Sequence, residues 1–569
     1  MKNQRSRKKN STHDSNPLSQ RMSGAQISNS HFAGDQTFRI KRLCQIGIAL
    51  SAEKDLNTLL EMILTEARQL TNADAGTLYL VDHENRCLRF EILQNDTLRE
   101  QRVSAGALAH DLPPILLEVG GKPNHNNVSS HVALTGETVN IPDVYFVNDF
   151  DFTGPRKYDA ATGYRSRSML VVPMKNHESE IIGVLQLINA KDPISGEIIP
   201  FADQYLDLIA SLASQAAIAL TNAQLIQNLK DLFQSFIRSI ATAVDEKSPY
   251  TGGHIRRVVE LTTMIARHID QTREGPFADV HFNDEEIEEI RMAAWMHDVG
   301  KITTPEHIIN KRTRLETIID RMELVETRFE LIRQTILGKH LDLRLRLLQG
   351  GITEATILDR LERDRDQALK SIESDCQLIR NINQRLGTVT DQELEQLFEI
   401  AEKSYQLDGR HYPYLTPDEV HNLSIRKGNL TGKERKIIEE HAMMTFEILK
   451  ELPFPKNLSR VLEFAAEHHE KVDGSGYPFG CSGNQLPLQA RIIAFADIFE
   501  SLTAQDRPYK KPQALAEAIE IIKRMRADGH VDPDLLDIVI KDRIHEEYAR
   551  LELTPGQIDP EEESSSPTQ

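Results

Sequence analysis

The sequence predicts a multidomain protein in which an α+β domain is joined by one long helix to an all-α bundle that carries a helical-hairpin insertion. The chain has 569 residues, which is too long for one hydrophobic core and suggests roughly three or four units. Alternation typical of β-hairpins is confined to the first third of the chain, whereas apolar residues recur at helical spacing in the remainder.

Composition and charge narrow the class of protein. The formal net charge of −19 argues against non-specific nucleic-acid binding, which requires a basic field. An anionic substrate would therefore need local positive charge, such as metal ions. The four cysteines, Cys44, Cys87, Cys376 and Cys481, form no CxxC pair and predict neither a disulfide framework nor a zinc knuckle. Without an apolar run of roughly 18 residues or a signal peptide, we expect a cytoplasmic protein with no membrane span.

Both ends of the chain are polar. Residues 1–36 are rich in Ser, Asn, Gln, Lys and Arg, and residues 553–569 are acidic and rich in serine. Such compositions contain too few apolar residues to form a core, so we expect both ends to be disordered.

The first predicted domain spans residues 37–222 and combines helices with an antiparallel sheet. Residues 40–70 carry apolar side chains at helical spacing with a break near residues 51–54, which predicts two helices. Hairpin patterns follow twice, in the segments 76–81 with 88–93 and 168–173 with 181–188.

One segment of this domain is more specific. It runs from Asn140-Ile141-Pro142-Asp143-Val144-Tyr145 to Thr162-Gly163-Tyr164-Arg165-Ser166-Arg167-Ser168-Met169-Leu170. On this segment and on the order of elements, the domain resembles the GAF sensory domain, in particular the GAF domains of cyclic-nucleotide phosphodiesterases and cyclases. The resemblance implies a pocket for a small ligand such as a cyclic nucleotide.

In those GAF domains a downstream Asn-Lys…Phe…Asp-Glu pattern stabilises the pocket. This chain has Asn189, Lys191 and Phe201, but Tyr205 and Leu206 stand in place of the acidic pair. The identity of the ligand therefore stays open, and so does the alternative that this domain only dimerises and binds nothing.

A long helix is predicted over residues 205–243. Its apolar residues recur at three-four spacing for about 35 residues, or roughly 50 Å, and begin with Ile209, Leu212, Ala216, Ala219, Ala223 and Ile226. We interpret this pattern as a coiled-coil seam for a second copy of the chain, which predicts a parallel homodimer. The alternative is that the seam packs on its own domain.

The second half of the chain contains residues that ligate transition metals. They are His254, the adjacent His297 and Asp298, His441, the adjacent His468 and His469, and Asp497. Imidazoles and carboxylates are common ligands of such metals. Taken alone, His254 is explained as a helix cap or a core residue, and His441 as a core residue. The pair His468-His469 is alternatively two surface residues before a Gly/Pro turn, whereas adjacent His297 and Asp298 at the end of an apolar helix are a stronger signal. A carboxylate at the end of an apolar run, however, is costly to bury without a partner, and a cation is the natural partner.

Together with the turn Gly474-Ser475-Gly476-Tyr477-Pro478, these residues resemble the HD-GYP domain of metal-dependent phosphohydrolases. The resemblance implies an all-α bundle, which we place at residues 236–552, and two divalent metal ions, usually iron or manganese. It implies one ion held by His254, His297, Asp298 and Asp497, and a second held by His441, His468 and His469, with Asp298 bridging the two. Relatives with a third ion carry a carboxylate where this chain has Tyr250, although Asp245 leaves a third ion open.

In this family a hydroxide held between two cations attacks phosphorus in line, which gives Asp298 a catalytic role. Lys301 is placed to face bound phosphate as a point charge, so we assign it to catalysis and to substrate binding. The resemblance also implies that the turn lies beside the substrate and that two downstream cations contact its second phosphate or a base. The implied substrate-binding residues are Lys301, Gly476, Tyr477, Pro478, Arg507 and Lys510. Arg507 and Lys510 are alternatively solvated surface charges.

An insertion of about 115 residues interrupts the HD-GYP pattern, and we place it at residues 312–425. Apolar residues recur at three-four spacing from Leu315 to Ile336 and again from Leu358 to Ile379, on either side of Gly350-Gly351. The pattern predicts an antiparallel helical hairpin, for which regulatory docking is one hypothesis.

We therefore expect a GAF-regulated HD-GYP phosphodiesterase that hydrolyses cyclic di-GMP in bacterial signal transduction. The cyclic di-GMP substrate follows only from the family resemblance. The alternatives are another HD-type nucleotide phosphohydrolase, which the intact Gly-Tyr-Pro turn disfavours, and a catalytically silent scaffold, which the complete ligand set disfavours. The sequence leaves open the metal, the GAF ligand, the sign of regulation and the product, either the linear dinucleotide or two mononucleotides.

Overall fold

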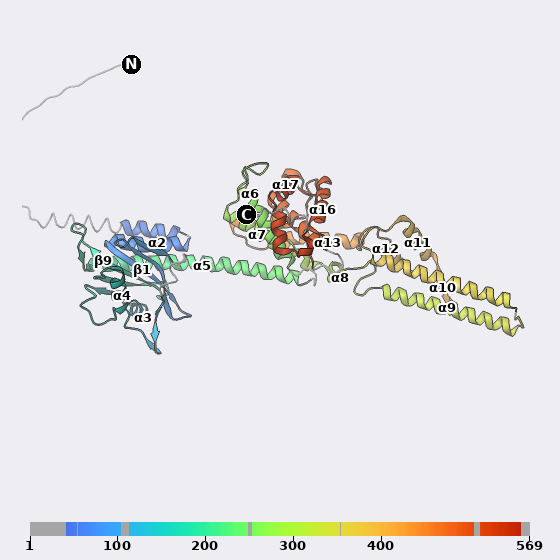
Figure 1. Cartoon of the computed structure of the whole chain (residues 1–569), viewed down its shortest axis with the longest axis horizontal. Helices are drawn as coiled ribbons and strands as arrows, with labels where there is room; N and C mark the ends of the chain where they lie inside the picture. The colour runs from blue at the N-terminus through green and yellow to red at the C-terminus, as the bar shows by residue number, and fades with distance from the viewer. Residues whose placement is uncertain are drawn as a thin grey trace, which may run out of the picture. The chain divides into compact units, whose positions relative to one another are not determined.

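The structure is a computed structural model that describes residues 41–53, 55–103, 113–247, 253–352, 354–505 and 512–558. The chain divides into two compact units, Met1–Asp231 and Leu232–Gln569, which are described separately (Figure 1). Tyr250, Arg507 and Lys510 lie outside the described residues, as do residues 1–36.

The first unit is built on an antiparallel sheet with the strand order β3-β2-β1-β9-β8-β7, to which β4 adds on β2 and β10 adds on β9. The strands of this sheet are β1 (Ala73–Asp82), β2 (Cys87–Asn95), β3 (Glu100–Val103), β4 (Ile115–Leu116), β7 (Val139–Ile141), β8 (Met169–Lys175), β9 (Ile181–Lys191) and β10 (Ile198–Ile199). A separate short pair joins β5 (Glu118–Val119) to β6 (Lys122–Pro123). Both predicted hairpins, β1–β2 and β8–β9, are confirmed.

Helices cover both faces of this sheet (Figure 1). Residues 41–52 are helical, and together with α2 (Leu56–Thr71) and the start of α5 (Leu206–Asp245) they bury one face. The other face is covered by α3 (Val128–Thr135), and α4 (Thr153–Thr162) follows on the same side. The predicted break between the first two helices is confirmed, because Asp55 caps α2 by accepting a hydrogen bond from the Thr58 amide.

Lys191 of the Asn-Lys pattern pairs with an acidic residue that lies outside the expected positions 205 and 206. The Lys191 ammonium donates a hydrogen bond to Asp74 on the neighbouring strand β1, and the Tyr164 hydroxyl donates to the same carboxylate at 2.8 Å. The Asn189 side chain donates to the Tyr164 hydroxyl. Asp74 therefore replaces the acidic pair that is missing at positions 205 and 206, and it comes from a strand far away in sequence.

Helix α5 serves mainly as a core helix rather than as the predicted seam. Ile209, Leu212 and Ala216 are fully buried in the first unit, against its own sheet and α2. Their assignment to a partner helix is therefore wrong, and the alternative of packing on the same domain is correct. Farther along, Ile237 and Ala241 are buried in the core of the second unit.

Among the described residues, one helical stretch, Asp203–Asp245, is long and apolar enough to meet the length and composition criteria of a membrane span. Of its most apolar window, 39% is buried inside the protein. Core helices of globular domains meet the same criteria, so this stretch is weak evidence for a span.

The second unit is helical and has two adjoining cores. Its elements are α6 (His254–Gln271), α7 (Asp284–Met296), η3 (Val299–Thr303), α8 (Glu306–Ile309), α13 (Gly432–Lys450), η4 (Lys456–Leu458), α14 (Val461–Ala466), η5 (Gly483–Gln485), α15 (Leu488–Thr503), α16 (Leu515–Ala527), α17 (Pro533–Lys541), α18 (Ile544–Glu552) and η6 (Pro555–Gln557). The last of these corrects one prediction, since disorder was expected from residue 553. Residues 553–558 instead hold η6, where Gln557 is buried and donates to the Thr503 carbonyl at 2.9 Å.

A third core lies between α8 and α13 in the chain. Two long helices, α9 (Met322–Gln349) and α10 (Ala355–Gln384), run side by side and form the predicted hairpin (Figure 1). The sequence pattern did not predict the smaller elements that close this core, α11 (Asp391–Glu402), β11 (Ser404–Leu407), β12 (Arg410–Pro413) and α12 (Pro417–Leu423).

Two buried cations hold the root of this hairpin. Arg314 is fully buried and donates to backbone carbonyls, including that of Ile425 at 3.2 Å. The Lys311 side chain is also fully buried and binds both carboxylate oxygens of Glu434, at 2.8 and 2.9 Å. Because Glu434 lies in the first turn of α13, the hairpin is tied directly to that helix.

Candidate metal centre

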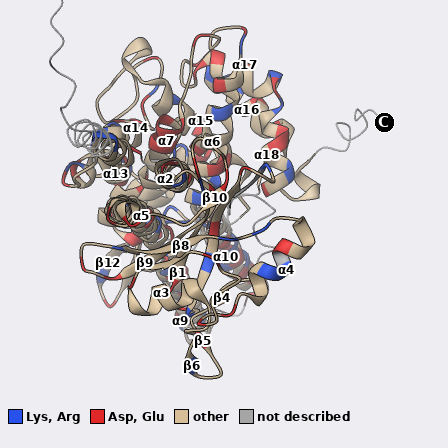
Figure 2. Ribbon diagram, turned by 90° about the vertical axis from the view of Figure 1, so that its left-hand side faces the viewer, with Lys and Arg blue, Asp and Glu red and all other residues tan. Residues whose placement is uncertain are grey.

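The His297-Asp298 pair lies where helix α7 ends. Asn283 and Glu286 form a reciprocal capping box at its start, and its first turn is acidic. Red ribbon at the α7 label in Figure 2 marks acidic residues of this helix. Negative charge at a helix N-terminus is favourable, so the helix begins at a defined residue. It ends at Met296, which places His297 and Asp298 immediately after the last helical turn.

Gly300 lies against helix α13 without space for a side chain. A Cβ atom at this position would lie 1.9 Å from the His441 carbonyl oxygen and 2.5 Å from the Thr445 amide nitrogen. The Gly300 amide also donates to the Thr445 hydroxyl at 3.0 Å, and this hydroxyl donates to the His297 carbonyl. Gly300 therefore allows two backbones to approach closely.

The seven predicted ligands come from five places in the second unit and converge on one point. His254 begins α6, His441 lies within α13, and Asp497 lies within α15. His468 and His469 directly follow α14. His297, His441, His468, His254 and Asp298 are all at least 97% buried.

Backbone carbonyls determine the tautomer of three histidines. The Nδ1 atoms of His297, His441 and His468 lie 2.8, 2.5 and 2.6 Å from the carbonyl oxygen three residues earlier. A carbonyl can only accept a hydrogen bond, so Nδ1 must carry the proton in each ring. The lone pair of each Nε2 atom is then available as a ligand.

The two oxygens of Asp298 face two different sets of imidazoles. Oδ2 lies 3.3 Å from His297 Nε2 and 3.6 Å from His254 Nε2. Oδ1 lies 3.5 Å from His441 Nε2 and 4.0 Å from His468 Nε2. The ligand atoms form two groups, each within 4.8 Å, which are His254, His297 and Asp298, and His441, His468 and His469. The seventh predicted ligand, Asp497, has its Oδ1 atom 3.3 Å from His254 Nε2.

The donor atoms of this cluster fit metal ions. Four of them, His297 Nε2, His441 Nε2, His468 Nε2 and Asp298 Oδ1, are buried and have no hydrogen-bond partner among the described residues. Buried polar atoms normally have partners, and several unpaired atoms converging on one carboxylate are explained by cations between them. The residues present therefore fit the two implied ions.

The protonation states agree with metal ligation. Burial lowers the pKa of His441 and of His468, and it lowers the pKa of His469 to about 3, so these rings are neutral. Burial opposes ionisation of Asp298, but Lys301 and His297 hold the pKa of this carboxyl well below its usual value. Neutral imidazoles and ionised carboxylates are the forms that bind metals.

His254 differs from the other histidines because carboxylates surround it. Burial opposes its charged form, but Glu500, Asp298 and Asp497 together raise the pKa of His254 well above its usual value. This side of the cluster therefore attracts positive charge.

Glu500 is a site residue that the sequence reasoning missed. It is fully buried, and one of its carboxylate oxygens binds His254 Nδ1 while the other accepts from the Arg257 guanidinium at 2.8 Å. An acidic residue one helical turn after Asp497 in an otherwise apolar helix was the available signal. Glu500 orients the His254 ring by binding Nδ1, so that Nε2 faces Asp298 and Asp497, as carboxylates do for metal-binding histidines.

Lys301 lies beside the cluster, and its ammonium is 2.5 Å from Asp298 Oδ2. A second lysine stabilises the same segment. Lys247 follows α5 and donates hydrogen bonds to the carbonyls of Lys301, Ile302 and Thr304. The predicted candidate for a third metal, Asp245, accepts hydrogen bonds from the amides of Gly253 and Ile255, which places it at the start of α6.

The Gly-Tyr-Pro turn folds back on the histidine pair. The Tyr477 ring lies 4.9 Å from the His469 ring, and the Tyr477 amide donates to the His469 carbonyl. Gly474 has a left-handed φ of 79°, whereas Gly476 is required because a Cβ there would lie 2.5 Å from Glu470 Cα. The turn thereby places Tyr477, which Pro478 follows, next to the predicted ligand His469.

Two acidic residues that had no predicted role shape this turn. Glu470 Oε1 accepts from the amides of Phe479 and Gly480, at 2.6 and 2.9 Å. Asp473 accepts from the Ser475 amide at 2.8 Å. Asp two residues before Ser, in a Gly-rich stretch, is a recognised turn signal, so this contact was predictable. The contacts of Glu470 with the Phe479 and Gly480 amides could not be predicted from the sequence.

Family models match both units of the chain. The model described as the GAF domain matches residues 55–220, and two models described as the HD domain match residues 251–369 and 367–535. The two HD matches meet and overlap at residues 367–369, which lie in α10 of the helical hairpin.

Known relatives share part of this similarity. The 3′3′-cGAMP-specific phosphodiesterase 1 of Vibrio cholerae is 35% identical over 126 residues, which is 22% of this chain and 28% of that protein. The cyclic di-GMP phosphodiesterase of Thermotoga maritima is 34% identical over 117 residues, 21% of this chain and 31% of that protein. The matches thus span less than a third of either relative. A solved GAF domain from an Acinetobacter phosphoenolpyruvate-protein phosphotransferase is 15% identical, with a TM-score of 0.25, over 34% of this chain and 98% of that one.

Substitution of Gly300 by alanine should disrupt the centre. The added Cβ would collide with the His441 carbonyl, and because backbone rather than a flexible side chain is in the way, we expect a cost of at least about 3 kcal/mol, the upper end of ordinary overpacking. Thermal unfolding and metal content measure the effect. Gly338→Ala is the control, since a Cβ there meets no atom within 4 Å. Normal stability and metal content in Gly300→Ala would contradict the close approach.

Substitution of Glu500 by glutamine should weaken metal binding without removing a ligand. Loss of a carboxylate behind a metal-binding histidine costs about 10- to 100-fold in affinity, which competition with a chelator measures for Mn²⁺. Glu520→Gln is the matched control, because Glu520 pairs with the exposed Lys523 on the surface of the same unit. Equal affinity in the two variants would show that Glu500 does not support His254.

Proposed function

We propose that this chain, an HD-domain protein with an N-terminal GAF domain, is a metal-dependent phosphodiesterase that hydrolyses a cyclic dinucleotide. The observation that supports this most strongly is the position of Asp298 between two sets of buried histidines with unpaired Nε2 atoms. The relatives named above act on cyclic dinucleotides, and they resemble this chain at 34–35% identity. We take cyclic di-GMP as the substrate.

One ion would be held by His254, His297, Asp298 and Asp497, and the other by His441, His468, His469 and the second oxygen of Asp298. When bound, such a pair of cations acidifies water and neutralises charge on a phosphoryl group. Iron and manganese suit this mixture of imidazole and carboxylate ligands.

The protein side chains have separate tasks in this reaction. The i−3 carbonyls keep the protons of His297, His441 and His468 on Nδ1, which fixes the ring orientation and leaves each Nε2 lone pair available as a ligand. Lys301 keeps Asp298 ionised and provides a positive charge at the edge of the cluster, where a substrate phosphate would bind. Tyr477 forms a wall beside His469. The partial exposure of Lys301 and Tyr477 makes this side the route of substrate entry.

A second cyclic dinucleotide is a specific alternative substrate. The Vibrio cholerae relative is named for 3′3′-cGAMP, and its identity to this chain is similar to that of the cyclic di-GMP enzyme. Both compounds therefore belong in the assay.

Alanine at Asp298 should abolish both bound metal and turnover, because the variant loses the one carboxylate that faces both histidine sets. The protein is purified without oxygen, its iron and manganese are measured, and hydrolysis of cyclic di-GMP and 3′3′-cGAMP is followed. Glu520→Gln, purified and assayed in the same way, is the control for losses of metal during preparation. Turnover by Asp298→Ala would refute the bridging role, and a metal-loaded wild-type protein that hydrolyses neither compound would refute the proposed function.

The first unit also presents a face of α5 for a second copy of the chain. Ile218, Leu225 and Leu229 are 42%, 49% and 64% exposed, and with Asn222 they follow a heptad pattern in which the asparagine occupies an a position. A single asparagine at a specifies register and oligomer state in coiled coils. We propose a parallel homodimer through this face, which has Leu229 in common with the predicted seam but otherwise uses different residues.

Substitution of Leu225 and Leu229 by lysine should convert the dimer into a monomer, because like charges on the two copies of α5 would face each other. Analytical ultracentrifugation at micromolar concentration measures the change. Gln227→Lys is the control, since position 227 lies on the opposite side of the helix in the same heptad. A wild-type protein that sediments as a monomer would contradict the proposal.

A further inference from the structure

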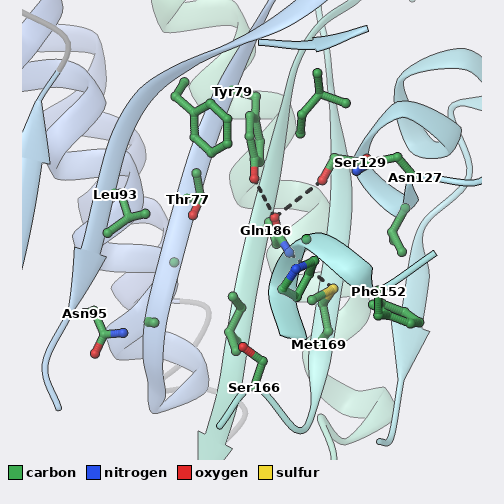
Figure 3. A pocket seen from close by; sticks show the side chains of 18 of the residues that line it. Thr77, Tyr79, Leu93, Asn95, Asn127, Ser129, Phe152, Ser166, Met169 and Gln186 are labelled. Atoms are coloured by element: carbon green, nitrogen blue, oxygen red, sulfur yellow. Dashed lines mark hydrogen bonds between the residues drawn. The ribbon is translucent and has the colours of Figure 1, made fainter. Parts of the chain in front are cut away.

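The GAF domain contains a cavity of about 350 Å³ that is separate from the metal centre. It lies between the sheet and the starts of α3 and α4, and strands β1, β2, β8 and β9 contribute to its wall (Figure 3). This volume falls within the range of small-molecule sites, roughly 300–1,000 Å³. It suffices for a one- or two-ring ligand.

The walls of this cavity are largely apolar and aromatic. The rings of Tyr79 and Phe90 lie 4.7 Å apart on adjacent strands. Phe152, at the start of α4, and Met169, on β8, are 3% and 1% exposed and line the same cavity (Figure 3). Such surfaces favour flat apolar rings, with thioether and aromatic contacts on both sides.

One polar side chain, Gln186, stands at the centre of the cavity (Figure 3). Its Oε1 accepts from the Tyr79 hydroxyl at 2.8 Å and from the Ser129 hydroxyl at 3.4 Å. Its Nε2 carries two hydrogens, but its contact is the Met169 sulfur at 3.2 Å, which is a weak acceptor. Gln186 therefore has a donor to offer to a ligand carbonyl or ring nitrogen.

The described lining of the cavity provides no cation for a phosphate. Among its described lining residues there is no lysine, arginine or histidine, and the one charged residue is Asp151. An anionic ligand would lose its hydration and would face a carboxylate of the same sign, which is costly.

Two helices start at the cavity, and one amide at each start is already used. The Asn127 side chain accepts from the Ser130 amide at the start of α3, and Asp151 accepts from the Thr153 amide at the start of α4. Pro155, in the first turn of α4, has no N–H to donate. Helix starts bind anions through such amides, so these two have fewer donors left for an anion than uncapped helix starts would have.

We propose that the GAF cavity binds an uncharged, flat molecule that accepts a hydrogen bond from Gln186, such as a ring carboxamide, and that it excludes nucleotides with a phosphate. This assignment departs from the cyclic nucleotide that the family resemblance implies. It concerns binding by the GAF domain alone, so it stands or fails independently of the activity proposed for the metal centre.

Matched pairs of probes test the ligand class on the full-length protein. Benzamide, nicotinamide and indole-3-carboxamide are compared with benzoate, nicotinate and indole-3-carboxylate by isothermal titration calorimetry, with cyclic AMP and cyclic GMP alongside. We expect at least one amide to bind at millimolar concentration or below, and at least about tenfold more tightly than its acid. The proposal is overturned if no amide binds, or if an acid or a cyclic nucleotide binds as tightly as the best amide.

Variants then locate the binding site. Gln186→Glu preserves the acceptor for Tyr79 and Ser129 but replaces the amide donor, so amide binding should weaken at least about tenfold. Gln94→Glu is the matched control. Gln94, in β2, is a buried glutamine like Gln186 and accepts from Arg68, but it does not line the cavity. Equal binding by both variants would overturn the role of Gln186.

A second substitution keeps the test decisive if Gln186→Glu is unstable. Thr77 lies on the cavity wall (Figure 3), and Thr77→Phe would fill part of the space. We expect this variant to lose amide binding while its unfolding temperature and metal content stay close to those of the wild type. Undiminished binding would place the ligand elsewhere and overturn the proposal.

Discussion

The second unit depends on the burial of the Asp298 carboxylate among histidines. An ionised group that is 97% buried is strongly unfavourable unless charges and donors surround it. Lys301 supplies one charge, but it contacts only one of the two carboxylate oxygens. His297, His441 and His468 direct unpaired Nε2 atoms at the two oxygens. Lone pairs facing a carboxylate would be repulsive without cations in between. This constraint explains why residues from five elements meet here in an otherwise apolar bundle.

The surrounding structure holds the predicted ligands in place through contacts on the side that faces away from Asp298. Helix carbonyls accept from the Nδ1 atoms of three histidines, Glu500 occupies the corresponding position for His254, and Gly300 lets the His-Asp segment lie directly on α13. The buried pair of Lys311 and Glu434 ties the helical hairpin to α13, two turns before His441. A motion of the hairpin root would therefore reach a metal-binding helix through one ion pair. This connection is a physical basis for the regulatory hypothesis suggested by the length of the insertion.

Much of this site could be predicted because its chemistry is carried by adjacent residues of distinctive type. His297-Asp298 and His468-His469 are visible in the sequence, and the structure brings all seven predicted residues together. Contacts between distant segments were not visible. Asp74 replaces a missing acidic pair from across the sheet, and Gly300 is needed for a backbone more than a hundred residues away. The seam in α5 was misassigned because a core helix and a coiled coil share the same three-four period, and only the sheet that covers Ile209 and Leu212 distinguishes them.

The central claim is that Asp298 bridges two metal ions, and anomalous diffraction from crystals grown without oxygen tests it most directly. Data collected on either side of the iron and manganese absorption edges would locate each ion. The account predicts two anomalous peaks, one beside each oxygen of Asp298, with His297 at one peak and His441 at the other. A single peak, or peaks that do not contact Asp298, would contradict it.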